Sequence, residues 1–124
     1  MWLAQIPTTI NSACKNKGGY LATLETEEEV IWMHGFRSFH ERLRVNSWIG
    51  GQKKGDVWSW KGLEQDFPIQ FFDWAETEPD NYEGLQNCLA LFGEYTIEGV
   101  PVAKTWFRFD DDACSTQNAF ICEK

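Results

Sequence analysis

The chain has 124 residues, a formal net charge of −8, 43% hydrophobic residues and 15% aromatic residues. This length fits one domain with a single core, and the apolar content is far above that of a disordered chain. The negative charge argues against nucleic acid and anionic membrane surfaces as partners, and no apolar run approaches the roughly 18–20 residues of a membrane span. We therefore expect a single domain, residues 1–124, that neither binds nucleic acid nor inserts into a membrane.

The N-terminal segment predicts a short strand followed by a helix. Loose alternation over residues 2–6 indicates the strand. A helix then begins at Thr8 or Thr9 and ends at the glycine pair 18–19, which supplies a left-handed stop. The helical spacing places Cys14 on the buried face of this first helix.

A second helix is predicted to begin at Thr26, because Thr26 and Glu29 have the spacing of a capping box. The run of Glu27, Glu28 and Glu29 lies where the positive end of the helix dipole favours anions, so we interpret it as a charged first turn and not as a ligand site. One stripe of the helix is formed by Val30, Met33, Arg37 and His40, and it is widened by Ile31, Trp32, Phe36, Phe39 and Leu43.

The rest of the chain predicts strands separated by turns and one long loop. Alternating or β-rich runs indicate strands at residues 48–51, 57–60, 86–92, 104–109 and 118–123. The glycines at 50 and 51 permit a close backbone approach or a bulge. Residues 61–82 show no sustained period, and a loop of that length in a compact domain is usually functional. Helices early and strands late predict an α+β domain.

The four cysteines, Cys14, Cys88, Cys114 and Cys122, include no Cys-x-x-Cys pair and have no histidine at zinc-finger spacing. Disulfides are therefore a better interpretation than a structural zinc site. Spacing alone leaves three connectivities open. Disulfides in a small aromatic-rich domain indicate an oxidising compartment, so we expect a secreted or extracellular protein.

Two stretches are rich in the oxygen ligands that Ca²⁺ prefers. The first begins at Glu78, Pro79 and Asp80 and continues to Cys88; the second is the acidic run at 110–112, two residues before Cys114. A bridge between Cys88 and Cys114 would bring the two stretches together, since bridged Cα atoms lie within about 7 Å. Converging carboxylates repel one another unless a cation neutralises them, so this arrangement favours calcium.

An ordered set of residues along nearly the whole chain resembles the C-type lectin domain family. The matching positions are residues 18–22, 26–29 and 48–51, Trp58, Trp60, Phe72, Trp74, and residues 78–80, 87–88 and 120–123. The resemblance implies a double-loop fold with two helices and two small antiparallel sheets. It also implies bridges from Cys14 to Cys122 and from Cys88 to Cys114, and a cis peptide before Pro79. The chain lacks an additional N-terminal cysteine pair, so it is similar to the short form.

Residue by residue, the resemblance assigns the calcium ligands to Glu78, Asp80, Gln86, Asp110 and Asp111, and sugar hydroxyls are expected to contact the same residues. Two positions depart from the usual types, because Gln86 replaces an acid and Asp110 replaces an asparagine. Each hydroxyl of a bound diol requires one acceptor and one donor, whereas Glu78 and Asp80 are both acceptors. Asn81 and Asn87 replace the acids of an auxiliary calcium site, which we expect to be weak or empty.

Tyr82 stands where galactose-type members of the family carry an aromatic ring that can stack on the sugar. Packing of Tyr82 on its own loop is the alternative. We therefore expect a calcium-dependent lectin that binds the vicinal hydroxyls of a terminal sugar, with galactose slightly favoured over mannose or fucose and with a homo-oligomer supplying avidity.

Two other functions compete with this expectation. A protein-binding or ice-binding relative could retain the fold without binding sugar, using the aromatic residues of the long loop. An enzyme is disfavoured, because a glycosidase needs one carboxyl held protonated while calcium chelation keeps the carboxylates ionised. His34 and His40 have no Ser or Cys at a recognisable elbow spacing, so both are read as ordinary helix residues.

Overall fold

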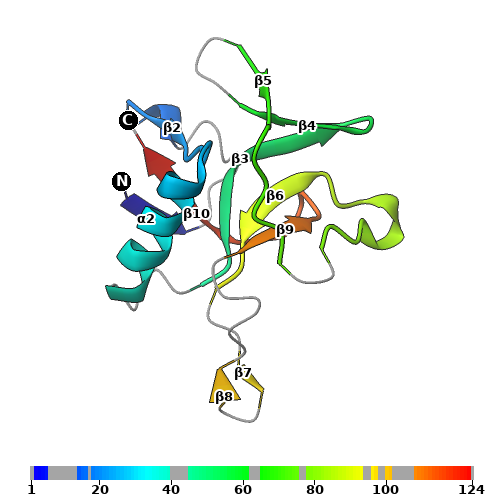
Figure 1. Cartoon of the computed structure of the whole chain (residues 1–124). Coiled ribbons are helices and arrows are strands. Elements are labelled where there is room, and N and C mark those ends of the chain that lie inside the picture. Colours follow the sequence, from blue (N-terminus) through cyan, green and yellow to red (C-terminus); the bar gives the residue numbers. More distant parts are fainter. Residues whose placement is uncertain are drawn as a thin grey trace.

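The computed structural model (Figure 1) describes residues 2–5, 14–16, 18–39, 45–61, 65–75, 78–93, 96–97, 100–101 and 108–123. Within these residues the helical elements are a turn at 14–16 and α2 (Glu27–Phe39). The remainder of the predicted first helix lies outside the described residues. None of the described helices is long and apolar enough to cross a membrane. The predicted α+β class is confirmed.

The strands are organised around β3 (Ser47–Lys54), which crosses the middle of the domain (Figure 1). The hydrogen-bonded path runs through β1 (Trp2–Gln5), β10 (Ala119–Glu123), β3, β4 (Val57–Trp60) and β5 (Phe67–Pro68). On its other edge β3 pairs with β6 (Cys88–Leu91), which pairs with β9 (Phe109–Asp112). A short β2 (Tyr20–Leu21) pairs with β10.

The sheet differs in detail from the two small antiparallel sheets implied by the family resemblance. Among the described strands, β3 and β10 pair in parallel at Ser47 and Trp48, while the second half of β3 pairs antiparallel with β4. One strand thereby joins both parts into an eight-stranded network. A separate hairpin of β7 (Thr96–Ile97) and β8 (Val100–Pro101) projects from the domain (Figure 1). The alternation of apolar and polar residues within a strand does not indicate which other strands pair with it, so the mixed sheet could not be predicted from that pattern.

Both predicted disulfides are present. Cys14 and Cys122 are bridged with Cα atoms 5.6 Å apart, and Cys88 and Cys114 are bridged with Cα atoms 5.2 Å apart. The first bridge links the N-terminal helical turn to β10, and the second links β6 to the chain leaving β9. The cis peptide bond between Glu78 and Pro79 is also present.

The main apolar core lies between α2 and the sheet. Its buried members are Ala22, Leu24, Val30, Met33, Ile49, Trp60, Ile69, Leu89, Leu91, Phe109 and Ile121. The backbones of β3 and β6 approach closely at Gly51, where an added Cβ would lie 2.5 Å from the side chain of Leu89. Only glycine fits there, which agrees with the close approach predicted for the glycine pair.

Helix α2 begins as predicted. The Glu29 N–H donates to Thr26 Oγ1 at 3.2 Å, the capping hydrogen bond expected from the sequence. Val30, Met33 and Arg37 are buried, but Ile31 and Trp32 are 61% and 54% exposed, so the apolar face is narrower than predicted. His40 and Leu43 lie outside the described residues.

The predicted C-terminal end of the strand at 104–109 was wrong. Residues 104–107 lie outside the described residues, and the strand that the structure describes, β9, begins at Phe109 and includes all three acids. Pairing with β6 explains the difference, since Leu91, Ala90, Leu89 and Cys88 lie opposite residues 109–112 in order. Cross-strand partners and the nearby bridge thus place a highly charged run within the sheet, which side-chain propensity alone disfavours.

Candidate metal centre

The three acids of β9 point to alternate sides of the sheet. Phe109 and Asp111 are buried, whereas Asp110 and Asp112 are half-buried. Successive side chains of a strand point to opposite faces, so Asp111 shares the face of Phe109 and of the apolar core. A carboxylate that is 1% exposed at the rim of an apolar core requires hydrogen-bond donors or a cation.

Part of that requirement is met by the long loop. Directly after the cis peptide, the Asp80 N–H donates to Asp111 Oδ1 at 3.1 Å and the Asn81 N–H donates to Asp111 Oδ2 at 2.7 Å. Asn81 adopts a left-handed conformation, with φ of 45°, and its Oδ1 accepts the Gln86 N–H at 3.3 Å. The buried carboxylate thereby attaches the loop to β9.

Glu78, Asp110 and Asp111 converge on one point. Each offers a carboxylate oxygen, and these oxygens lie within 4.8 Å of one another. Glu78 Oε1 is buried and accepts no hydrogen bond from the described residues. An acceptor that faces two further acceptors has no donor among them, so its favourable partners are a proton, a water molecule or a cation.

The electrostatics of this cluster follow from burial and like charge. Burial, together with the adjacent carboxylates of Asp110 and Asp111, raises the pKa of Glu78 above its ordinary value. Burial also raises the pKa of Asp110, opposed by its contact with Glu78 and reinforced by the charges of Asp112 and Asp111. Glu78 and Asp110 therefore hold protons more tightly than isolated carboxyls do, unless a cation takes the place of the protons.

The donor set fits a hard divalent cation. Ca²⁺ prefers several oxygen ligands from carboxylates, amides and carbonyls, and Glu78, Asp110 and Asp111 supply three carboxylates at a common centre. The described residues bring no cysteine or histidine into this group, so its chemistry differs from that of a zinc site.

The other two predicted ligands, Asp80 and Gln86, lie beside the cluster and pair with each other. With its amide nitrogen turned toward acceptors, Gln86 Nε2 donates to Asp80 Oδ1 at 2.6 Å and to the carbonyl oxygen of Asp111 at 2.8 Å. Asp80 Oδ1 also accepts the Tyr82 N–H at 3.3 Å. A carboxylate and an amide donor therefore lie side by side at the edge of the centre.

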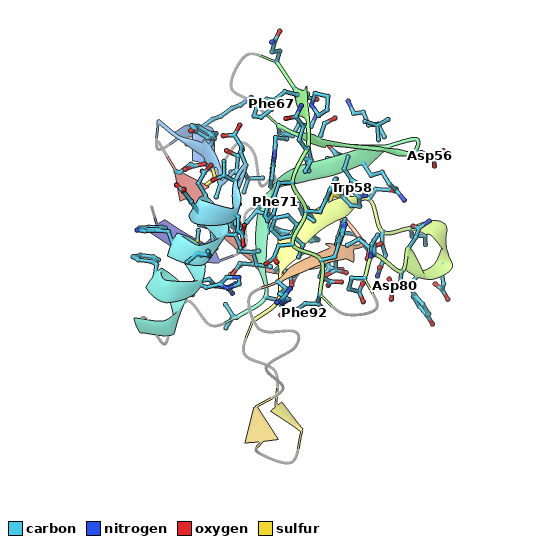
Figure 2. The ribbon with its side chains drawn as sticks, viewed as in Figure 1. Asp56, Trp58, Phe67, Phe71, Asp80 and Phe92 are labelled. Carbon is cyan, nitrogen blue, oxygen red and sulfur yellow. A yellow bond between two sulfur atoms is a disulfide. The ribbon has the colours of Figure 1, made fainter. Side chains whose placement is uncertain are left out.

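Tyr82 opens a short 3₁₀ turn, η2 (Tyr82–Gly84), and its side chain is 66% exposed. The side chain is therefore accessible to a ligand, and its exposure alone does not decide between stacking on a sugar and packing on its own loop. Figure 2 shows the neighbouring Asp80 on the side of the molecule opposite α2.

The structural role of Asp111 is not apparent from the sequence. Its two oxygens accept backbone N–H groups of the loop, and no side-chain pattern encodes such contacts. The only sequence signal was indirect: Cys88 and Cys114 each lie close to one of the acidic stretches.

A disulfide-linked α+β domain, with a loop attached to its sheet around convergent oxygen ligands, defines a ligand-binding module. Residues 7–124 match the family described as the lectin C-type domain. The chain belongs to the C-type lectin domain family, whose members are generally binding modules without enzymatic activity.

Two curated relatives illustrate the range of the family. The chain is 26% identical to C-type lectin 37Db of Drosophila melanogaster over 110 residues, which cover 89% of this chain and 65% of that protein. It is 22% identical to human E-selectin over 109 residues, which cover 88% of this chain and 16% of that protein. The match thus spans less than two thirds of either relative.

Solved structures with the same fold include the carbohydrate-recognition domain of the mouse scavenger receptor C-type lectin. It has a TM-score of 0.65 and 25% identity, and the match covers 92% of this chain and 76% of that one. A calcium-independent type II antifreeze protein has a TM-score of 0.64 and 24% identity, with 92% and 74% of the two chains covered. The second likeness concerns the fold alone.

Proposed function

We propose that this chain is a calcium-dependent carbohydrate-binding domain. The observation that carries the proposal is the buried Glu78 Oε1, which has no hydrogen-bond donor among the described residues and faces Asp110 and Asp111. Glu78, Asp110 and Asp111 would hold the ion, and Asp80 and Gln86 would complete its ligand set. When bound, calcium supplies positive charge and open coordination positions for sugar hydroxyls.

The residues beside the centre suit a vicinal diol. Each hydroxyl of such a diol donates one hydrogen bond and accepts one. Asp80 offers an acceptor, whereas both hydrogens of Gln86 Nε2 already have acceptors, Asp80 Oδ1 at 2.6 Å and the Asp111 carbonyl at 2.8 Å, so Gln86 donates to a hydroxyl only by giving up one of these hydrogen bonds. Glu78 and Asp110 offer only acceptors when ionised, so a hydroxyl beside them accepts its hydrogen bond from Asn81 or from water. A donor missing at a desolvated hydroxyl costs about 1–3 kcal/mol, so we expect weak binding by a single site.

Terminal galactose is proposed slightly ahead of mannose or fucose because of Tyr82. Its ring is 66% exposed and lies two residues after Asp80, where it is available to stack on the apolar face of a sugar. Weak single-site binding would be offset by avidity in a homo-oligomer. We also propose that residues 1–124 form one domain and that the protein is secreted or extracellular, since its two disulfides suit an oxidising compartment.

The test is calorimetric titration of galactose and of mannose into the protein, once with calcium and once with chelator. We expect saturable heat only with calcium and a lower Kd for galactose. The variant Glu78→Gln should abolish the sugar heat at limiting calcium, whereas Glu28→Gln on α2 is the matched control and should leave it unchanged. Sugar binding that persists in chelator would contradict calcium dependence.

A second candidate is a domain that binds ice or a protein and not sugar. It is favoured by the two acceptors, Glu78 and Asp80, on either side of the proline, which leave a sugar hydroxyl without an amide donor. Thermal hysteresis without calcium, together with no sugar heat at millimolar calcium, would support this candidate over the lectin.

A further inference from the structure

A row of aromatic side chains with one cation lies near the turn of the β3–β4 hairpin. Lys53 on β3 is directly opposite Trp58 on β4, and Lys53 Nζ is 5.8 Å from the centroid of the Trp58 ring. Trp58 contacts Trp74 edge-on at 5.4 Å, and Trp74 stacks on Phe72 at 5.5 Å. We define Trp58, Phe72 and Trp74 as the aromatic ledge.

The aromatic ledge adjoins the metal centre from two directions. On one side the Lys53 N–H donates to the Asn87 carbonyl at 2.8 Å, and Asn87 follows Gln86. On the other side Trp74 forms a bridge with Phe109, which precedes Asp110 and shares a face of β9 with Asp111. Figure 2 shows Trp58 and Asp80 on the same side of the molecule, away from α2. One extended ligand can therefore contact both places.

The ledge is accessible without being fully exposed. Phe72 is 36% exposed, and Trp58, Trp74 and Lys53 are half-buried. Rings held in this way by their neighbours present apolar surface at little cost in conformational entropy. Such a surface suits the C–H face of a sugar ring.

Lys53 gives this surface a positive charge within a chain of net charge −8. Among the described residues its ammonium group forms no ion pair, and it is held over the Trp58 ring by a cation–π contact. Lys54 points to the other face of the strand, because successive side chains alternate. An anionic substituent of a ligand bound on the ledge can therefore form an ion pair with Lys53 Nζ.

We propose that the aromatic ledge with Lys53 is a second subsite for an acidic saccharide, meaning a sugar unit that carries a sulfate ester or a carboxylate. The proposal rests on the calcium-dependent carbohydrate binding proposed above and names the ligand class of that site. The anion pairs with Lys53 Nζ, and its sugar ring packs on Trp58 and Phe72. The neutral diol of the terminal sugar remains at Glu78, Asp110 and Asp111.

The strand spacing sets the geometry of the ligand. Lys53 lies on β3 and Asp111 on β9, with β6 between them, so their backbones are two strand spacings, or about 10 Å, apart across the sheet. Because Gln52 is in line with Cys88 and Asp112, Lys53 and Asp111 are also offset by two residues, or about 7 Å, along the strands. This separation exceeds the reach of a substituent on the diol itself. The acidic group is therefore carried by the sugar next to the terminal one.

The test compares matched disaccharides by calorimetric titration of the full chain with calcium. Each disaccharide ends in galactose or mannose, and its second sugar is unmodified, sulfated or a uronic acid. We expect the acidic forms to bind about threefold to fivefold more tightly than the neutral form at low salt, the size of a single exposed ion pair. Comparing the sulfate with the carboxylate shows which anion the subsite prefers.

Two lysine variants separate the subsite from general charge. Lys53→Met keeps an apolar stem over Trp58 and should reduce the ratio of acidic to neutral affinity to about one. Lys54→Met removes the same charge from the other face of β3 and should leave the ratio unchanged. The subsite is overturned if both variants lower the ratio of acidic to neutral affinity equally, or if the unmodified chain shows no preference for acidic disaccharides. In either case, calcium-dependent binding of the neutral disaccharide would still support the proposed lectin function. If no disaccharide binds with calcium, the proposed function and the subsite fall together.

Discussion

The chain contains two runs of three acids, and the fold uses them in opposite ways. Glu27, Glu28 and Glu29 form the first turn of α2, where Glu27 and Glu28 are exposed and Glu29 is half-buried beside its cap. The other run, at 110–112, lies in β9, where Asp111 is buried and Asp110 joins Glu78 and Asp111 in one cluster.

The difference arises from the periods of helix and strand. Successive residues of a helix fan out by about 100°, so three acids spread into solvent around the positive end of the helix dipole. Successive residues of a strand alternate, so every second acid is forced toward the core. Acidity in a sequence therefore indicates a metal site only where the element and its neighbours concentrate the charges.

The largest expected effect is that of removing the buried acid of the strand run. Asp111→Ala removes two charge-assisted hydrogen bonds from the backbone of the loop and leaves both N–H groups without their acceptor. We expect a loss of about 2–4 kcal/mol in the free energy of unfolding, measured by urea denaturation in chelator. Glu28→Ala on the helix run should change it by less than about 0.5 kcal/mol. An equal loss of unfolding free energy in Asp111→Ala and Glu28→Ala would contradict the different structural roles of the two acidic runs.

Neutralising Glu78 should separate calcium binding from stability. Glu78→Gln removes one of three mutually repelling carboxylates, so the metal-free protein should be no less stable than the unmodified chain. The same change removes a ligand charge, and calcium affinity should fall by at least about tenfold. Both values follow from thermal denaturation over a calcium series. A metal-free variant that melts lower would show that Glu78 stabilises the fold without calcium.

The effect of calcium should depend on pH with a definite sign. In the metal-free protein, burial and neighbouring carboxylates raise the pKa of Glu78, and burial raises that of Asp110. The folded state then binds more protons than the unfolded state above the ordinary carboxyl pKa, so metal-free stability falls as the pH rises through that window. Calcium replaces those protons. The increase in Tm on adding calcium should be larger at pH 8 than at pH 5, and the reverse order would contradict the cluster.

The smallest effects are expected in the helix run. Thr26→Ala removes the cap of α2 and should cost about 1 kcal/mol, while Glu28→Gln should cost about 0.3–0.5 kcal/mol through the helix dipole. Neither change should alter the rise in Tm that calcium produces. A smaller calcium response in either variant would show that the two acidic runs are coupled.

The local features of the fold were predictable where one short pattern determines them. The Thr26 cap of α2 is confirmed, and so is the tight packing at Gly51. The disulfide pairs and the cis peptide at Pro79 came from the family resemblance and not from spacing, which left three pairings open.

The features that depend on tertiary partners were not predictable. The acids belong to β9 because β6 lies opposite them, and Ile31 and Trp32 are exposed because the sheet covers only one side of α2. Lys53 lies outside the strands predicted at 48–51 and 57–60, and its cation–π partner is its cross-strand neighbour Trp58. Each of these features depends on which segments pack together in the folded chain. The hydrophobic periodicity of a single segment does not identify its packing partners.

The central claim is that Glu78, Asp110 and Asp111 form a single calcium site. Calorimetric titration of calcium into the metal-free protein, with Glu78→Gln as the matched variant, tests it most directly. We expect one ion per chain, with a Kd of about 0.1–1 mM, the range of calcium sites in extracellular modules, and markedly weaker binding in the variant. An absence of saturable heat in the unmodified chain, or an unchanged isotherm in Glu78→Gln, would contradict it.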